Sequence, residues 1–357
     1  MLSIGPIVDS QPEKLSLNRF VSGKRKAIST STENWVRLAQ LRNDTSLPLV
    51  IRPNMEEMDL AGWAADNREF VCKLLLKHGG LLFRGFRLQG AIDLEQFIRA
   101  ISTEPLEYRE RSSPRHRVNG NIYTSTDYPA DQSIFLHNEN SYQHIWPLKI
   151  FFFCLTAAEH GGETPIADCR KVYQRINPQV RERFNQKKIL YVRNFAGGIG
   201  LSWQTVFGTT DKAAVEEYCR QAGIETEWRS DNHLRTRQVR EAVASHPLTG
   251  EMLWFNHAAF FHVSTLDHSI RKQLASIFKA EDYPNNTYFG DGSEIEPEVL
   301  DELRAAYRDE TITFPWQAGD ILVLDNMLTA HGRAPFSGSR KVLVGMAEAI
   351  SHRGISA

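Results

Sequence analysis

The stretch Phe135-Leu136-His137-Asn138-Glu139 completes a short apolar segment that is typical of a core strand. In an extended strand, residues two apart point to the same face, so His137 and Glu139 can bind one ion together. A third ligand has to come from elsewhere in the chain, and His331, which follows a late apolar strand, supplies it. Two imidazoles and one carboxylate, with the opposite face left open, are the ligand set of non-haem Fe(II) oxygenases.

The same three ligand types leave a second metal open. Zinc also accepts two histidines and one glutamate, as in metalloproteases. Those enzymes carry His-Glu-x-x-His on a helix, and no such motif occurs in this sequence. The sequence therefore favours Fe(II) and keeps a zinc hydrolase as a rival.

Around these ligands the chain alternates short strands with helices in no regular strand–helix–strand repeat. Apolar strand patterns occur at 81–86, 133–136, 150–155, 312–314, 320–325 and 341–347, and the first of them follows a helical pattern over 54–78. This arrangement argues against a doubly wound sheet. It predicts a mainly β fold with flanking helices, a jelly roll (double-stranded β-helix). We expect an N-terminal extension over 1–45 and a single catalytic domain over 46–357, with a lid or insert within about 187–310.

Composition excludes several classes of protein. The 357 residues carry a formal net charge of −1, so no basic excess indicates a nucleic-acid partner. The longest apolar run, 150–155, is too short to cross a bilayer. Four widely spaced cysteines predict free thiols rather than a disulfide framework, and no signal peptide is visible. We therefore expect a cytoplasmic protein, with its oligomeric state left open to a homo-oligomer.

An Fe(II) oxygenase of this kind uses O₂ and 2-oxoglutarate, whose distal carboxylate needs a buried cation. Arginine suits it best, because its planar fork donates two hydrogen bonds to a carboxylate. Arg340 starts the last strand, which a turn would bring back beside His331, and Arg333 is the rival. Thr164, after two glycines, can donate to the same carboxylate.

Together these features resemble the TauD/TfdA (taurine dioxygenase/clavaminate synthase-like) family of Fe(II)/2-oxoglutarate oxygenases. The resemblance rests on Gly80 to Phe86, on His137-x-Glu139, on Gly161-Gly162-Glu163-Thr164 and on His331 with Arg340. It implies a jelly-roll fold, a metal triad at His137, Glu139 and His331, and co-substrate contacts from Thr164 and Arg340. Related halogenases carry a small residue at the acidic position, so Glu139 favours hydroxylation.

Further stretches resemble the syringomycin-type amino acid β-hydroxylases within that family. They are 108–115, 137–142, 254–256 and 288–293. This resemblance implies an amino acid substrate, either free or tethered to a peptidyl carrier protein. The candidate substrate contacts are Arg111, Arg115, Asn138, Ser141 and Asn256, and for the two arginines a solvated basic loop is the competing interpretation.

The sequence thus predicts hydroxylation of an unactivated C–H bond of an amino acid in specialised metabolism. Desaturation, epoxidation or cyclisation of a small natural product by the same oxidant stays open. From another class, a non-catalytic jelly-roll binding protein is the alternative.

Overall fold

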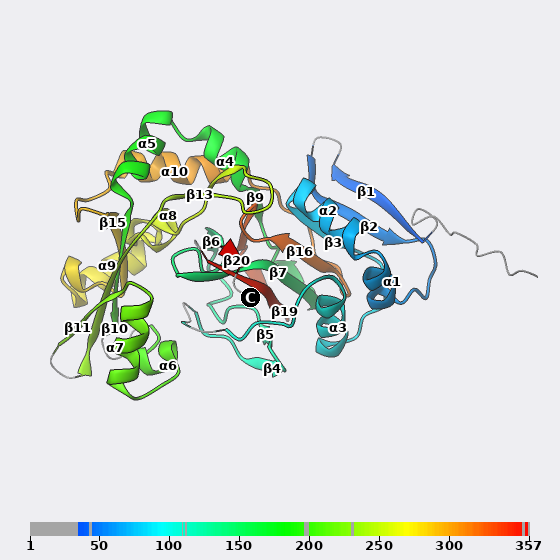
Figure 1. The fold of residues 1–357 in the computed structure, drawn as a ribbon, viewed down its shortest axis with the longest axis horizontal. Coiled ribbons are helices and arrows are strands. Elements are labelled where there is room, and N and C mark those ends of the chain that lie inside the picture. The colour runs from blue at the N-terminus through cyan, green and yellow to red at the C-terminus, as the bar shows by residue number, and fades with distance from the viewer. Residues whose placement is uncertain are drawn as a thin grey trace, which may run out of the picture.

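The computed structural model describes residues 35–42, 45–108, 110, 113–195, 200–229, 232–351 and the backbone of 354–355. Its centre is one large sheet (Figure 1). The strands lie in the order β1 (Val36–Arg42), β2 (Thr45–Pro53), β3 (Gly80–Phe83), β16 (Ile321–Asp325), β7 (Ile145–Thr156), β19 (Lys341–Ser351), β5 (Ile122–Thr124) and β4 (Arg117–Asn119), and β20 (Gly354–Ile355) pairs with β19.

A smaller sheet carries the predicted ligand segments. Its order is β6 (Ile134–His137), β17 (Thr329–Arg333) and β9 (Ile166–Asp168). A separate two-stranded sheet pairs β8 (His160–Gly161) with β18 (Phe336–Ser337). Ile166 of β9 belongs to the same core cluster as Phe152 of β7, so the two sheets share one apolar interior. The mainly β jelly roll expected from the sequence is confirmed.

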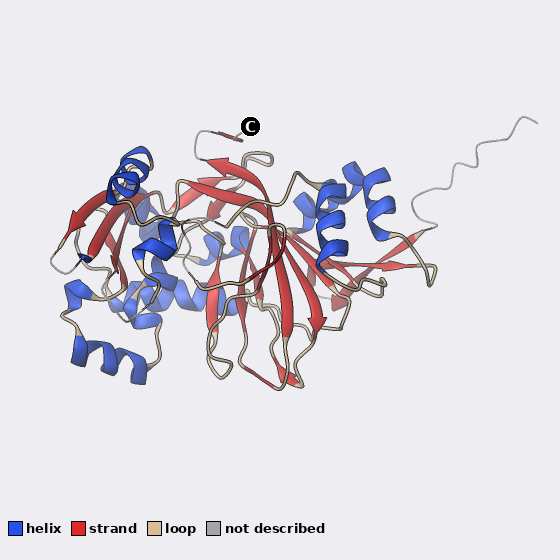
Figure 2. Cartoon of the chain, turned by 90° about the horizontal axis from the view of Figure 1, so that it is seen from below, coloured by secondary structure: helices blue, strands red, loops and turns tan. Residues whose placement is uncertain are grey.

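Side chains of β7 alternate between two cores, as the period of a strand requires. Phe151 and Phe153 pack with the first three helices, whereas Phe152 and Cys154 face the interior between the sheets. Those helices cover the outer face of the large sheet (Figure 2) and are α1 (Leu60–Asp66), α2 (Arg68–His78) and α3 (Ala91–Ile101).

The region from 187 to 310 forms a second body of structure on the other side of the central sheet (Figure 1). Its sheet has the order β11 (Glu225–Trp228), β12 (Leu234–Arg240), β10 (Ile189–Phe195) and β15 (Asn285–Phe289), with β13 (Val243–Ser245) paired to β14 (Met252–Trp254). The helices leading into and through it are α4 (Cys169–Arg175), α5 (Pro178–Lys187), α6 (Trp203–Phe207), α7 (Lys212–Gln221), α8 (Ala258–Phe261), η3 (Val263–Thr265), α9 (His268–Ile277), η4 (Ala280–Asp282) and α10 (Pro297–Asp309).

The helical pattern over 54–78 does not form one helix. Asp59 caps α1 by accepting a hydrogen bond from the Gly62 amide, and Asn67 separates α1 from α2. The Asn67 side chain donates to the Trp63 carbonyl at 2.8 Å, a local bond of the kind that competes with helix continuation. The expected strand at 312–314 is also absent, and Ile312 there forms only an isolated bridge with Ile166.

The predicted N-terminal extension lies mostly outside the described residues, which begin at Trp35. From Val36 the chain forms the β1–β2 hairpin. The proposed division at residue 46 and the lid role of 187–310 stay predictions. Among the described residues, no helix is both long and apolar enough to cross a membrane.

Candidate active site

Strand register places the two predicted histidine ligands opposite each other. β17 runs antiparallel to β6, with His331 paired to His137, and to β9, with His331 paired to Ile166. Directly opposed residues in an antiparallel pair project to the same face, with Cβ atoms about 5 Å apart. The His137 and His331 ring centroids are accordingly 4.6 Å apart.

Glu139 completes the cluster just beyond the end of β6. One ligand atom from each of His137, Glu139 and His331 lies within 4.8 Å of the others. The separation between His331 Nε2 and Glu139 Oε2 is 3.8 Å, too long for a hydrogen bond. It is shorter than two metal–ligand bonds of about 2.1 Å laid end to end, so one ion fits between them.

Protonation of the three side chains also fits a metal. Burial, then the neighbouring imidazoles His331 and His257, hold the pKa of His137 well below its usual value, and burial lowers the pKa of His331. Burial raises the pKa of Glu139, but Arg115 and the two histidines outweigh it and leave this carboxyl well below its usual range. At neutral pH the site therefore offers two neutral imidazoles and one carboxylate, the forms that bind metal.

The backbone fixes which nitrogen of His137 is available. Its Nδ1 lies 2.8 Å from the Phe135 carbonyl oxygen, which can only accept, so Nδ1 carries the proton. Nε2 then keeps its lone pair for an ion, as in metal sites whose histidine is held by a carbonyl. Phe260 stacks on the same ring at 4.4 Å and 7° and limits its rotation.

Asn326, which the sequence interpretation missed, clamps the backbone of Glu139. Its Oδ1 accepts from the Glu139 amide at 2.7 Å, and its Nδ2 donates to the carbonyls of Glu139 at 2.9 Å and Pro147 at 2.8 Å. The residue is fully buried in the turn between β16 and β17. The turn that leads to His331 therefore also holds Glu139. An asparagine five residues before a predicted ligand histidine cannot by itself reveal such a clamp.

We expect Asn326→Asp to weaken Fe(II) binding about 10- to 100-fold, the usual cost of losing a group that orients a ligand. The new carboxylate oxygen would face two carbonyl oxygens in place of the amide that donates to them. Anaerobic Fe(II) titration and thermal unfolding measure the effect, with the exposed Asn285→Asp as the matched control. Unchanged iron affinity and unchanged stability would contradict the clamp.

Gly332 allows β6 to approach β17 beside the histidines. A Cβ at this position would lie 2.6 Å from the Ile134 carbonyl oxygen, closer than packed atoms allow. The glycine after His331 is therefore required by the close approach of the two strands that carry the imidazoles.

A pocket lies next to the His137–Glu139–His331 cluster. His137 and His331 line it, together with Arg115, Thr164, Arg333 and Arg340. Phe152 also lines it and packs on the His331 ring at 5.0 Å. Two of the predicted ligands and all the predicted co-substrate residues therefore meet in one cavity.

Arg340 and Thr164 are positioned with unused donors. Arg340 donates from Nε to the Gly162 carbonyl at 2.8 Å and from Nη1 to Ser125 at 3.3 Å, and Nη2 makes no hydrogen bond within the described chain. Burial lowers the pKa of Arg340 to about 10, which leaves it charged at neutral pH. Trp316 Nε1 donates to Thr164 Oγ1 at 3.2 Å, so the hydroxyl hydrogen remains free to donate elsewhere.

Arg333 is largely committed to another task. Its two Nη groups donate to the backbone carbonyls of Tyr128, Pro129 and Gln132. These bonds tie the loop before β6 to β17. Arg333 lines the pocket, but Arg340 has the freer guanidinium for a carboxylate.

The family model of the "Taurine catabolism dioxygenase TauD, TfdA family" matches residues 43–347. The chain belongs to the TauD/TfdA family. It is accordingly an Fe(II)/2-oxoglutarate-dependent oxygenase, and its His-Glu-His cluster is compatible with the iron that such an enzyme needs.

Curated relatives cover most of this chain. The dapdiamide synthesis protein DdaC of Enterobacter agglomerans is 42% identical over 280 residues, 78% of this chain and 85% of the relative. A clavaminate synthase-like protein of Arabidopsis thaliana is 29% identical over 289 residues, 78% of this chain and 84% of the relative.

A solved structure shares the fold. PvcB, described as an Fe, alpha-ketoglutarate dependent oxygenase from an isonitrile synthetic pathway, matches with a TM-score of 0.54 at 15% identity. The match covers 93% of this chain and 98% of PvcB.

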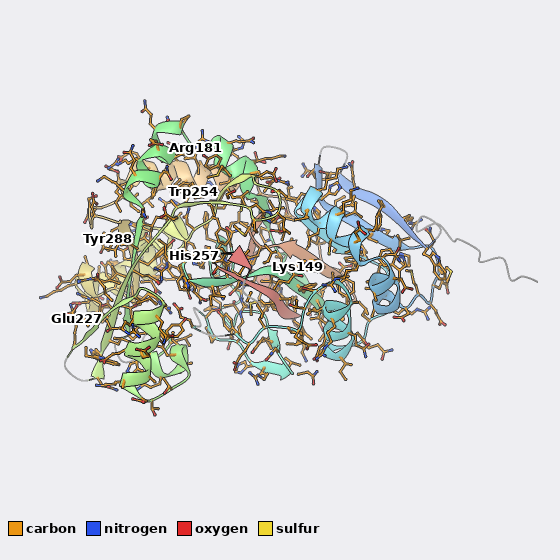
Figure 3. All side chains as sticks on the ribbon, in the orientation of Figure 1. Lys149, Arg181, Glu227, Trp254, His257 and Tyr288 are labelled. Carbon is orange, nitrogen blue, oxygen red and sulfur yellow. The ribbon has the colours of Figure 1, made fainter. Side chains whose placement is uncertain are left out.

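In this TauD/TfdA chain one histidine of the region after β10 lies beside the His-Glu-His cluster. His257, labelled near the middle of the molecule in Figure 3, places Nε2 2.7 Å from the Asn138 carbonyl oxygen. Its ring lies 5.7 Å from that of His137, and burial lowers its pKa to about 4. His257 is not among the residues that line the pocket.

The predicted substrate contacts divide into three groups. Arg111 lies outside the described residues, and Arg115 lines the pocket. Asn138 and Asn256 are buried, and their amides bond inside the protein: Asn138 donates to the Asn326 carbonyl at 2.6 Å and Asn256 to the Ala242 carbonyl at 2.6 Å. These side chains hold backbone together, and their contact with substrate stays a prediction. Ser141 is buried and is not among the residues lining the pocket.

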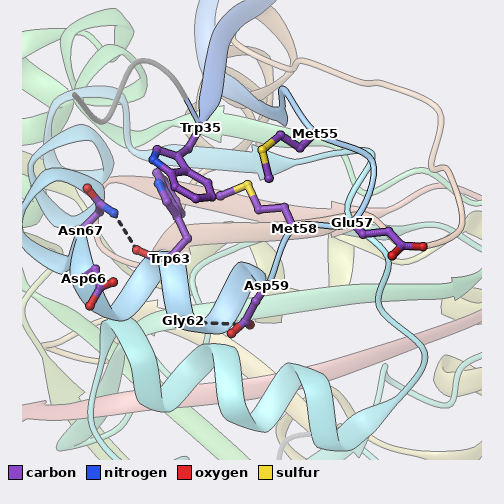
Figure 4. A pocket seen from close by; sticks show the side chains of 9 residues that line it. All are labelled: Trp35, Met55, Glu57, Met58, Asp59, Gly62, Trp63, Asp66 and Asn67. Carbon is purple, nitrogen blue, oxygen red and sulfur yellow. Dashed lines mark hydrogen bonds between the residues drawn. The ribbon is translucent and has the colours of Figure 1, made fainter. Parts of the chain in front are cut away.

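A second hollow of this TauD/TfdA chain lies against α1 (Figure 4). Its walls include Trp35, Met58 and Trp63, with Asp59 and Asp66 among the acidic residues. It shares no lining residue with the pocket at His331.

Proposed function

We propose that His137, Glu139 and His331 hold one Fe(II) and that Arg340 with Thr164 binds the distal carboxylate of 2-oxoglutarate. The observation that carries this assignment is the convergence of the three ligand atoms within 4.8 Å at a pocket that Arg340 and Thr164 also line. The donor set and its protonation support iron. The free Nη2 of Arg340 and the free hydroxyl hydrogen of Thr164 support a carboxylate.

We further propose that the substrate is an amino acid, free or tethered to a carrier protein, in specialised metabolism. The support is the 42% identity to a protein named for dapdiamide synthesis. The overall reaction consumes the substrate C–H bond, 2-oxoglutarate and O₂, and yields the C–OH product, succinate and CO₂. Bound iron supplies the coupling of 2-oxoglutarate decarboxylation to transfer of one oxygen atom into the C–H bond.

The protein's part is to hold geometry and exclude water. β6 and β17 fix the imidazoles through register, while Phe260 stacks on the His137 ring and Phe152 contacts the His331 ring in an edge arrangement. Asn326 fixes the Glu139 backbone. Such a pre-positioned site places reacting groups without reorganisation during the reaction.

A succinate-release screen tests the proposed function. The anaerobically iron-loaded protein receives 2-oxoglutarate, O₂ and either free L-amino acids or their carrier-bound thioesters. We expect one substrate to release succinate in a 1:1 ratio to a product heavier by one oxygen atom, and chelation of iron to stop both. Turnover without iron or without 2-oxoglutarate would contradict the proposal.

The cysteines support a reducing location. Cys72, Cys154, Cys169 and Cys219 are all unpaired, and disulfides are rare in the cytoplasm. We propose that the enzyme acts there, where Fe(II) is also easiest to maintain.

A further inference from the structure

Arg115 is a buried cation with one bond to the candidate iron site. Its Nη2 donates to Glu139 Oε2 at 2.7 Å, and the residue is 7% exposed. Its Cζ lies 4.8 Å from the centroid of the Tyr108 ring, which supports one face of the guanidinium. The side chain is therefore held in place by a carboxylate and an aromatic ring.

The rest of this guanidinium is unsatisfied. Nε and Nη1 of Arg115 are buried and have no hydrogen-bond partner among the described residues. Buried charged donors without partners are costly, so such a group indicates a ligand. Arg115 lines the pocket beside His137 and His331, so a ligand there can reach it.

Charge points to an anion. Arg115, Arg340 and a ferrous ion add positive charge to a pocket in which the ligand Glu139 is negative. A doubly negative 2-oxoglutarate leaves that sum positive. The unused, charged N–H donors of Nε and Nη1 can each give a charge-assisted hydrogen bond to a carboxylate oxygen.

We propose that Arg115 is a carboxylate receptor whose guanidinium also holds the iron ligand Glu139, so that anion binding and the metal site share one side chain. This inference rests on the proposed function. The carboxylate has two possible sources, the 1-carboxylate of 2-oxoglutarate or a free carboxylate of the amino acid substrate. Glu139 Oε2 accepts a hydrogen bond from Arg115 and lies 3.8 Å from His331 Nε2. An anion bound to Arg115 therefore changes the electrostatic environment of the Glu139 carboxylate.

The test compares wild type, Arg115→Lys and Arg115→Gln at full iron occupancy without O₂. The first arm titrates 2-oxoglutarate and follows the visible absorption of the iron–2-oxo acid complex. The second arm adds L-amino acids and, separately, their carboxamides, and follows the change in that absorption. Arg117→Gln is the matched control, since Arg117 is two residues away with a side chain 52% exposed.

We expect Arg115→Gln to weaken binding of the carboxylate that Arg115 receives roughly 10- to 100-fold, the range for hydrogen bonds to a charged group. Arg115→Lys should recover part of that loss, and Arg117→Gln should match wild type. A loss in the first arm assigns the 1-carboxylate. A loss of affinity for amino acids in the second arm, in which the wild type prefers acids over carboxamides, assigns the carboxylate of the substrate.

Two results together overturn the inference. Arg115→Gln binds 2-oxoglutarate with the affinity of the wild type, and it distinguishes amino acids from their carboxamides no differently from the wild type. The iron–2-oxo acid absorption of wild type keeps this result separate from the proposed function. If wild type lacks that absorption, the proposed function is wrong. If wild type has it and Arg115→Gln behaves identically, only the receptor is wrong.

Discussion

His137→Ala is expected to abolish Fe(II) binding and turnover. The substitution removes one of three ligands, and the remaining carboxylate and imidazole cannot hold the ion alone at micromolar iron. The loss should exceed the roughly 100-fold cost of removing an orienting group behind a ligand. Anaerobic Fe(II) titration and succinate release measure it.

The control for this variant is His268→Ala, at an exposed histidine at the start of α9. Both variants should keep the circular dichroism spectrum of the wild type. Iron binding by His137→Ala with wild-type affinity would place the metal elsewhere.

Arg340→Ala is expected to raise the 2-oxoglutarate concentration needed for half-maximal turnover by at least about 10-fold, since charge-assisted bonds of about 1.5–3 kcal/mol are lost. Iron binding should change little, because Arg340 bonds Gly162 and Ser125 rather than a metal ligand. Steady-state kinetics over a range of 2-oxoglutarate concentrations measures the shift.

Arg340→Lys, which keeps the charge but loses the fork, should fall between alanine and wild type. Arg333→Ala is the comparison on the next candidate, and we expect it to reduce thermal stability by freeing the loop at 128–132. An unchanged 2-oxoglutarate requirement in Arg340→Ala, together with a raised one in Arg333→Ala, would reverse the assignment.

The ligand strands could be predicted because their information is local. His137 and Glu139 follow an apolar strand pattern, and the late strand that ends at Asp325 precedes His331. Neither pattern states which strands pair. The register that sets His331 opposite His137 depends on the whole fold and on a glycine that permits close approach.

Roles that depend on distant partners could not be predicted. Asn256 was predicted to contact substrate from its sequence alone, whereas the structure shows its amide bonded to the backbone at Ala242 and Ala258. Arg333 was the rival of Arg340 for the 2-oxoglutarate carboxylate, but its Nη groups donate to three carbonyls of one loop. Side-chain type and spacing indicate what a residue can do, whereas the fold decides which of its donors are already used.

The same limit applies to helix boundaries. The apolar spacing from Met58 to Leu75 is compatible with one helix. At the break, the Asn67 side chain bonds the Trp63 carbonyl, a contact that apolar periodicity does not record. The end of α2 at Gly79, with φ of 76°, was predictable because glycine favours that left-handed conformation.

We propose that three side chains, from β6, the turn beyond it and β17, share one ferrous ion. The most direct measurement is an anomalous difference map at the iron absorption edge, from crystals grown anaerobically with Fe(II) and 2-oxoglutarate. We predict one peak about 2.0–2.2 Å from an imidazole nitrogen of His137, from one of His331 and from a carboxylate oxygen of Glu139. A peak elsewhere, or an iron that lacks any of these three ligands, would contradict the account.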